Sequence, residues 1–222
     1  MNIVYGICVY YGYFREKNIH RHIQVYNQLI ATYPSYTFKF IINLMIDEKD
    51  LTIRSTIAEN IKERLPGHLT ILTNYNYGGT IAGLYDTYEY LKENMMYDWY
   101  IMYFEEDFTA TNIKFLEMSI PLLEDVIYVG ETTYSTNSIK QDMYKGEQKH
   151  WTDGGYYFSS YKKFNTIYST IGTFHKGDTT TKYDHFLDGI ILGEMGFPSM
   201  LYDAGFKFIG LPRGTYFVHN EP

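Results

Sequence analysis

Apolar runs of strand length alternate with segments of helical periodicity through the first half of the chain, and this alternation constrains the fold most strongly. The strand-like runs cover residues 2–11, 36–47, 68–76 and 99–104. Between them, apolar residues recur at helical spacing over residues 19–33, 53–65 and 78–95. The pattern predicts an α/β fold with a mostly parallel central sheet and helices on both faces.

The apolar positions of each predicted helix indicate which side should be buried. The first helix has its apolar face at Ile19, Ile23, Tyr26 and Ile30. The second has Ile53, Ile57, Ile61 and Leu65, and Pro66 and Gly67 end it. The third has Ile81, Leu84, Tyr88 and Leu91. We expect these faces to pack against the sheet.

The second half of the chain is less regular. Residues 125–134, 154–160 and 206–212 are typical of strands, and the polar stretch 131–152 predicts a long loop of the kind that commonly carries function. The sequence has no linker and no sign of a second core, so we expect one domain over residues 1–222. The abrupt end after "RGTYFVHNEP" leads us to expect a longer, multidomain chain.

Composition argues against two classes of partner. The formal net charge is −7 and Lys and Arg are scattered, whereas nucleic-acid binding needs a basic stripe. No apolar stretch approaches the roughly 20 residues of a membrane span, and the N-terminus lacks the features of a signal peptide. The single cysteine, Cys8, cannot form an internal disulfide, and a chain without disulfides is typical of a reducing compartment. We therefore expect a cytoplasmic protein without a membrane span.

Three acidic residues, Glu105, Glu106 and Asp107, directly follow the fourth strand-like run. In a sheet of this kind ligands bind at the carboxyl ends of the strands, and these acids lie at such an end. Neighbouring carboxylates repel one another, so they either take up protons through a raised pKa or share a cation. If the strand continues, Glu106 points away from Glu105 and Asp107. A solvated loop is the alternative interpretation.

Several segments together resemble GT-A-fold glycosyltransferases, which transfer a sugar from a nucleotide-sugar donor. They are "NYNYGGTIAGLYDTYEYL" leading into "WYIMYFEEDF", then "HWTDGGYYF", "GEMGFPSMLYDAGF" and "YFVHNEP". The resemblance covers nearly the whole chain. It implies a nucleotide-sugar-binding half over residues 1–110 and an acceptor-binding half over residues 111–222.

The resemblance also implies a divalent-cation site. Glu105 and Asp107 match the two acidic positions of the family's Asp-x-Asp motif, and His219 matches a late His that completes the metal site in several retaining families. Carboxylates suit Mn²⁺ or Mg²⁺, and a His ligand favours Mn²⁺. Glu105 departs from the family's Asp, which leaves open whether it contacts the metal directly. His219 could equally be a surface residue.

The donor implied by the resemblance is a UDP-sugar, with UDP-glucose or UDP-rhamnose favoured. Asp47, at the end of the second strand, either contacts the base or caps the following turn. The glycines of "YNYGG" either let the backbone approach the donor or cap the next helix. The full set of expected substrate-binding residues is Val9, Tyr10, Tyr11, Asp47, Asn76, Gly78, Gly79, Trp151, Gly154 and Gly155.

The expected catalytic residue depends on the stereochemical course. An inverting enzyme needs a carboxylate that deprotonates the acceptor hydroxyl, and Glu194 has the position of such a base. A retaining enzyme needs an acidic group beside the reacting sugar, for which Asp153, Asp184 and Asp188 are candidates. Helix capping is the alternative role for Asp184. His219 favours the retaining course.

Two other functions are compatible with the sequence. A glycoside hydrolase would use paired carboxylates without nucleotide or metal. A non-catalytic glycan-binding module would use aromatic residues such as Trp151 and Tyr157. The opening "YGICVYYGYFR" further resembles the N-terminal domain of large chlorovirus glycosyltransferases that build capsid glycans, which implies a glycan or glycoprotein acceptor in the host cytoplasm.

Overall fold

The computed structural model describes residues 1–65, 67, 69–75, 79–132, 152–172 and 197–220. The first half alternates strands and helices, with a short 3-10 helix after the first strand: β1 (Asn2–Tyr10), η1 (Tyr11–Tyr13), α1 (Glu16–Thr32), β2 (Thr37–Ile46), α2 (Leu51–Arg64), β3 (Thr70–Tyr75), α3 (Gly79–Glu93) and β4 (Trp99–Glu105). The second half adds β5 (Phe108–Ala110), α4 (Phe115–Leu122), β6 (Tyr128–Thr132), β7 (Thr152–Ser160), α6 (Tyr161–Ile171), α7 (Phe197–Asp203), β8 (Phe208–Pro212) and β9 (Phe217–His219).

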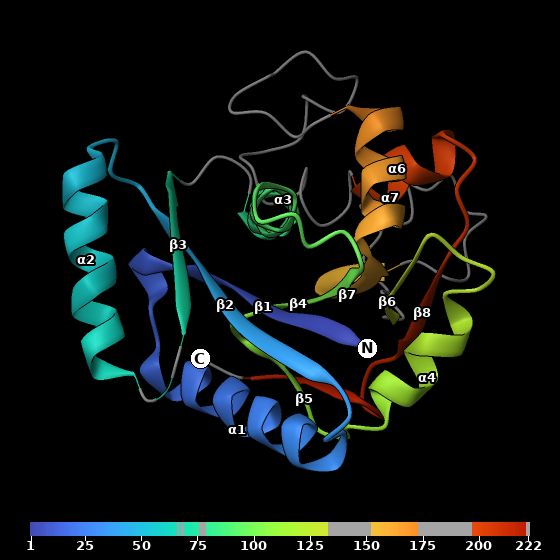
Figure 1. Ribbon diagram of the computed structural model, residues 1–222, viewed down its shortest axis with the longest axis horizontal. Helices are drawn as coiled ribbons and strands as arrows, with labels where there is room; N and C mark the ends of the chain where they lie inside the picture. Colours follow the sequence, from blue (N-terminus) through green and yellow to red (C-terminus); the bar gives the residue numbers. More distant parts are fainter. Residues whose placement is uncertain (66, 68, 76–78, 133–151, 173–196, 221–222) are drawn as a thin grey trace, which may run out of the picture.

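Seven strands form one central sheet in the order β3-β2-β1-β4-β7-β6-β8, and β5 and β9 form a separate two-stranded ribbon. Within the sheet, β7 is antiparallel to both of its neighbours, while the other neighbouring strands run parallel. Helices α1 and α4 lie on one face, and α3, α6 and α7 lie on the other (Figure 1). The predicted α/β fold, with a mostly parallel central sheet and helices on both faces, is confirmed.

Each face of the sheet has its own hydrophobic core. Successive residues of β1 contribute to opposite cores, with Tyr5 and Ile7 facing α1 and Val4 and Cys8 facing α3. Because helices cover this central parallel strand on both sides, β1 is buried and without a polar or charged side chain from Ile3 to Val9, apart from the tyrosine hydroxyl. No helix among the described residues is long and apolar enough to cross a membrane.

The buried face of α1 differs from the one predicted. The structure buries Asn18, Ile19, His22, Val25 and Leu29, while Ile30 is 42% exposed. Of the predicted face, Ile19 is buried and Ile23 and Tyr26 pack partly buried against the core, so the error is limited to Ile30 and to the two buried polar residues that a count of apolar residues misses. Similarly, Ile53 of α2 is exposed, whereas the apolar face predicted for α3 is buried as expected.

The order of the strands creates a switch point. From β1 the sheet grows through β2 to β3 in one direction, and the next strand, β4, then lies on the opposite side of β1. Cys8 of β1 is in register with Glu105 at the end of β4, so the carboxyl ends of the two strands lie side by side. Ligands of open α/β sheets bind in the crevice at this kind of position.

Some elements were not expected from the sequence. The β5-β9 ribbon consists of strands of three residues, too short for a period to be visible. Helices α4 and α6 were also missed, and α4 contains Pro121. At the ends of the loop predicted over residues 131–152, Glu131 and Thr132 belong to β6 and Thr152 begins β7, while residues 133–151 lie outside the described residues.

Candidate active site

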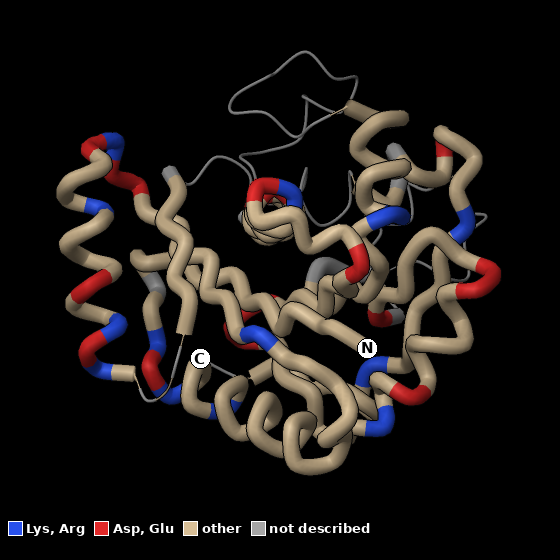
Figure 2. The backbone as a smooth tube through the Cα atoms, in the orientation of Figure 1, with Lys and Arg blue, Asp and Glu red and all other residues tan. Residues whose placement is uncertain are grey.

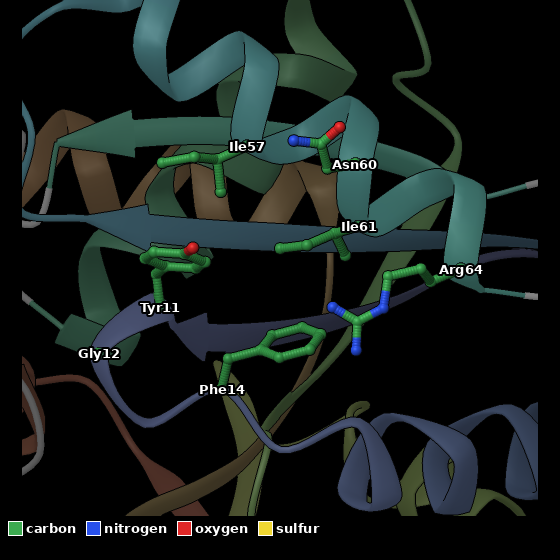
Figure 3. A pocket seen from close by; sticks show the side chains of 7 residues that line it. All are labelled: Tyr11, Gly12, Phe14, Ile57, Asn60, Ile61 and Arg64. Carbon is green, nitrogen blue, oxygen red and sulfur yellow. The ribbon is translucent and has the colours of Figure 1, made fainter.

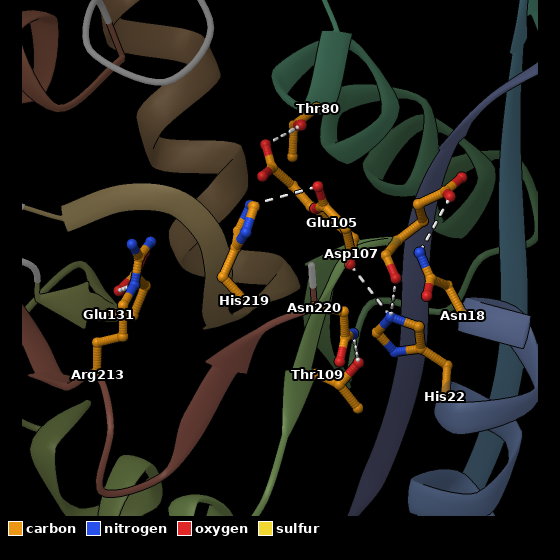
Figure 4. Close-up of polar contacts among 11 residues, drawn as sticks. Asn18, His22, Thr80, Glu105, Asp107, Thr109, Glu131, Arg213, His219 and Asn220 are labelled. Atoms are coloured by element: carbon orange, nitrogen blue, oxygen red, sulfur yellow. Dashed lines mark hydrogen bonds and ion pairs between the residues drawn. The ribbon is translucent and has the colours of Figure 1, made fainter. Parts of the chain in front are cut away.

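Three carboxylates, Glu105, Glu106 and Asp107, form an acid turn at the end of β4 (Figure 4). Glu105 faces α3, where the Thr80 hydroxyl donates a hydrogen bond of 2.5 Å to its Oε1. Glu106 faces α1, where Asn18 Nδ2 lies 3.4 Å from its Oε1. The prediction that these two neighbours point to opposite sides is confirmed. The carboxylates of Glu105 and Glu106 thus face the helices on opposite sides of the sheet.

Asp107 and His219 are brought together by the β5-β9 ribbon. Phe108 pairs with His219 in the ribbon, and the His219 Nε2 lies 3.3 Å from Asp107 Oδ2 (Figure 4). The backbone N–H of Asn220 donates to the Asp107 carbonyl at 2.6 Å. The side chains of Asp107 and His219 are 38% and 51% exposed. This pair is therefore held in place by the backbone but open to a ligand.

His22, on α1, connects the acid turn to this helix through hydrogen bonds. Its side chain is fully buried, and its Nε2 lies 3.1 and 3.0 Å from the backbone carbonyl oxygens of Glu105 and Glu106. Its Nδ1 lies 2.8 Å from the Tyr5 hydroxyl. Carbonyls only accept, so Nε2 carries the hydrogen and Nδ1 accepts from Tyr5. Burial lowers the pKa of His22 to about 4, and the imidazole is neutral at physiological pH.

A buried ion pair anchors the chain that leads to β9. Arg213, between β8 and β9, donates from Nε and Nη2 to the two carboxylate oxygens of Glu131 at 3.0 and 2.5 Å. Glu131 is fully buried, and the Arg213 guanidinium lies 5.0 Å from the ring centre of Phe108. A Cβ on Gly155 would lie 2.6 Å from the same ring. Gly155, which was expected to bind substrate, thus has a packing role that does not depend on substrate: it allows β7 to approach β5 closely.

The substrate-binding residues expected near β1 occupy different environments. Val9 is buried in the core, so only its backbone can reach a ligand. The Tyr10 hydroxyl donates a hydrogen bond to the exposed Asp47 carboxylate. Asp50, and not Asp47, caps α2 by accepting from the backbone N–H groups of Thr52 and Ile53.

A pocket of about 580 Å³ lies beside η1 and α2 (Figure 3). Tyr11, 42% exposed, and Phe14 supply aromatic rings, and Asn60 supplies an amide. Arg64 forms an ion pair with Glu16, and its guanidinium lies 5.9 Å from the centre of the Phe14 ring. Aromatic rings beside an amide can stack on and hydrogen-bond a flat polar ring.

Other expected site residues are only partly placed by the structure. Gly79 begins α3, and Asp153 and Gly154 belong to β7, where Asp153 pairs with Glu131 in the ladder. Outside the described residues lie Asn76, Gly78, Trp151, Asp184, Asp188 and Glu194. Within the described ranges, no three His, Cys, Asp or Glu side chains are grouped so as to hold a metal ion. The predicted ligands Glu105, Asp107 and His219 are therefore not gathered into one group of three, but Asp107 and His219 lie together as a pair.

Glu106 makes the stability of the protein dependent on pH. Burial raises the pKa of Glu106 to about 7, from an ordinary value of 4.5, and the nearby Asp107 adds to the increase. A raised folded-state pKa contributes stability that is present below pH 4.5 and is lost as the pH rises through 7. We expect Glu106→Gln to avoid this loss. The difference in unfolding free energy, variant minus wild type, should therefore rise by about 2 kcal/mol between pH 5 and pH 8.

Urea denaturation at several pH values, with a chelator present, measures this difference. Glu63→Gln, on an exposed part of α2, is the matched control and should show a constant difference from the wild type. If Glu106→Gln also showed a constant difference, the carboxyl would not be protonated preferentially in the folded state.

No protein-family model and no curated protein sequence matches the chain. Solved structures do resemble it. One is described as a glucose-1-phosphate thymidylyltransferase from Bacillus anthracis; it is 9% identical, has a TM-score of 0.52, and the match covers 98% of this chain and 89% of that chain. Another, a 4-diphosphocytidyl-2C-methyl-D-erythritol synthase from Anaerococcus prevotii, is 11% identical with a TM-score of 0.53, over 95% and 86% of the two chains. The chain has the same fold as these proteins.

Proposed function

We propose that the protein is a metal-dependent glycosyltransferase that transfers a hexose from a UDP-sugar to a glycan acceptor. The observation that supports this most is the position of the acid turn. It lies at the switch point between β1 and β4, next to the first turn of α3 and opposite His219. Nucleotides bind at switch points of such sheets, and helix N-termini favour phosphate groups.

The Asp107–His219 pair fits a divalent cation. Two adjacent ligands of an octahedral ion, each at about 2.1 Å, lie about 3 Å apart. The observed 3.3 Å between His219 Nε2 and Asp107 Oδ2 is close to that value. A bound Mn²⁺ or Mg²⁺ would neutralise the charge that develops on the diphosphate leaving group. Glu105, whose carboxylate accepts a hydrogen bond from Thr80, would contact the ion through water or contact the ribose.

The other residues of the site would orient the reactants. His22 binds the backbone carbonyls of Glu105 and Glu106 and would thereby help to hold the following residue, Asp107, beside β9. The pocket beside Tyr11 and Asn60 has groups suited to the nucleobase. We further propose a retaining course with the catalytic acid among Asp153, Asp184 and Asp188; Glu194 is the base if the course is inverting. A role in viral capsid glycosylation stays a prediction from the sequence resemblance.

Thermal unfolding with a panel of nucleotides tests the proposed function. UDP or a UDP-hexose at about 100 times its dissociation constant should raise Tm by roughly 5 °C when Mn²⁺ is present, because ligand and ion stabilise the native state. With EDTA the shift should disappear. GDP serves as the matched control, and UDP shifts of equal size in EDTA would contradict the metal dependence.

Other arms of the same panel distinguish the alternatives. Nucleoside triphosphates belong in it because one similar structure is described as a thymidylyltransferase. Stabilisation by a triphosphate and not by a UDP-hexose would favour transfer of a nucleotidyl group. Stabilisation by oligosaccharides without nucleotide or cation would favour a glycan-binding module, and release of sugar from a simple glycoside would favour a hydrolase.

A further inference from the structure

A groove of about 810 Å³ lies between α1 and the β5-β9 ribbon, and we call it the α1 groove. Four polar residues of α1 line it, at positions spaced by four, three and four: Lys17, Arg21, Gln24 and Gln28. Residues of and next to the ribbon line the other side, among them Thr111, His219 and Asn220. Since His219 also contacts Asp107, the groove adjoins the proposed metal pair.

The polar lining of the groove follows from how α1 packs. Asn18, His22, Val25 and Leu29 form the buried stripe that holds α1 against the sheet. Each of the four polar lining residues of α1 is one position before a member of this stripe, so the polar stripe runs beside the buried one along the helix. Lys17 and Gln28 are separated by about 16 Å of helix axis, which is longer than one sugar ring.

The two cationic side chains of the groove, Lys17 and Arg21, are not engaged by a carboxylate of the described residues, although the acid turn lies near this end of the groove. Among the residues that the structure describes, none forms an ion pair or hydrogen bond with the side chain of Lys17 or Arg21. The nearby Glu16 instead pairs with Arg64 and His20. Along α2, by contrast, both signs alternate (Figure 2). Two cations four residues apart on a helix repel each other, and a bound anion relieves this repulsion.

We propose that the α1 groove binds an anionic oligosaccharide, with a phosphate or carboxylate group held by Lys17 and Arg21. Arg and Lys make strong charge-assisted hydrogen bonds to such groups, and Gln24, Gln28 and Thr111 offer amides and a hydroxyl to sugar hydroxyls. Asn18 and His22 contact the acid turn, so the cationic end of the groove lies nearest to it. The identification of this ligand as the acceptor rests on the proposed function.

The test compares three small probes without nucleotide and with EDTA: α-D-glucose 1-phosphate, D-glucuronate and neutral D-glucose. Their dissociation constants are measured by ligand-observed NMR for the wild type and for Lys17→Gln/Arg21→Gln. Lys162→Gln/Lys207→Gln is the control, since it removes the same charge from two exposed lysines outside the groove. The preferred anionic probe then shows whether the natural group is a phosphate or a carboxylate.

We expect at least one anionic probe to bind the wild type and the control about tenfold more tightly than glucose, and the groove variant to lose that advantage. Equal binding of the anionic probes by the wild type and the groove variant would overturn the proposal, as would no preference over glucose. Neither result depends on UDP or Mn²⁺. If UDP gave no thermal shift but the anionic probes still bound, the proposed transferase function would be rejected and the proposed anion binding in the α1 groove would stand.

Discussion

Asp107→Asn is expected to lower kcat/KM for sugar transfer by a factor of about 10³ while the protein stays folded. The amide has the shape of the carboxylate but is a poor cation ligand, so the leaving diphosphate loses several kcal/mol of charge stabilisation. Removing one of three neighbouring carboxylates also reduces repulsion in the acid turn. The measurement is the initial rate of UDP release from the donor with Mn²⁺, alongside circular dichroism to check the fold.

Glu106→Gln is the matched control for this substitution. It makes the same carboxyl-to-amide replacement one residue earlier, but its side chain faces Asn18 of α1 and not the His219 pair. Its activity should stay within about threefold of the wild type, because it removes no proposed ligand. Comparable losses in the two variants would contradict the division of the acid turn between the two faces.

His22→Leu is expected to lower the free energy of unfolding by about 3 kcal/mol. Leucine fills a similar volume, so the effect arises from hydrogen bonds and not from a cavity. The substitution leaves the Tyr5 hydroxyl and the carbonyls of Glu105 and Glu106 without the imidazole partner in a buried place. Urea denaturation at pH 7.5, where the wild-type imidazole is neutral, measures the change.

His22→Gln tests whether the donated hydrogen bonds are responsible. The glutamine amide can still donate to the carbonyl oxygens of the acid turn, so its expected cost is only about 1 kcal/mol. The variant should also keep more of the Mn²⁺ affinity than His22→Leu. If both variants were as stable as the wild type, the contacts of His22 would not hold the acid turn in place.

The periodicity of the sequence predicted the layers of the fold because the long elements of the first half each have a clear repeat. The α3 face at Ile81, Leu84 and Leu91 is buried as that repeat requires. The predicted face of α1 was incomplete because Asn18 and His22 are buried for their contacts with the acid turn, 88 and 83 residues away. Buried polar residues of this kind have no local signal.

The candidate site was predictable in part. The resemblance to GT-A enzymes selected Asp107 and His219, and the structure places them together through the β5-β9 ribbon, which the sequence did not reveal. Thr80 and the Glu131–Arg213 pair were missed, because partners 25 and 82 residues apart are joined only by the fold. A buried Glu also looks like a surface residue in sequence, until Arg213 is known to neutralise it.

The most direct test of the central claim is the UDP-dependent binding of Mn²⁺, followed by the electron paramagnetic resonance signal of the free ion. In the proposed complex, nucleotide and ion each tighten the binding of the other. Added UDP should therefore remove much more of the free Mn²⁺ signal with the wild type than with Asp107→Asn. The variant also serves as the control for Mn²⁺ that is bound by UDP without protein. Equal signals from the two proteins at every UDP concentration would contradict a metal site at Asp107 that serves a bound nucleotide.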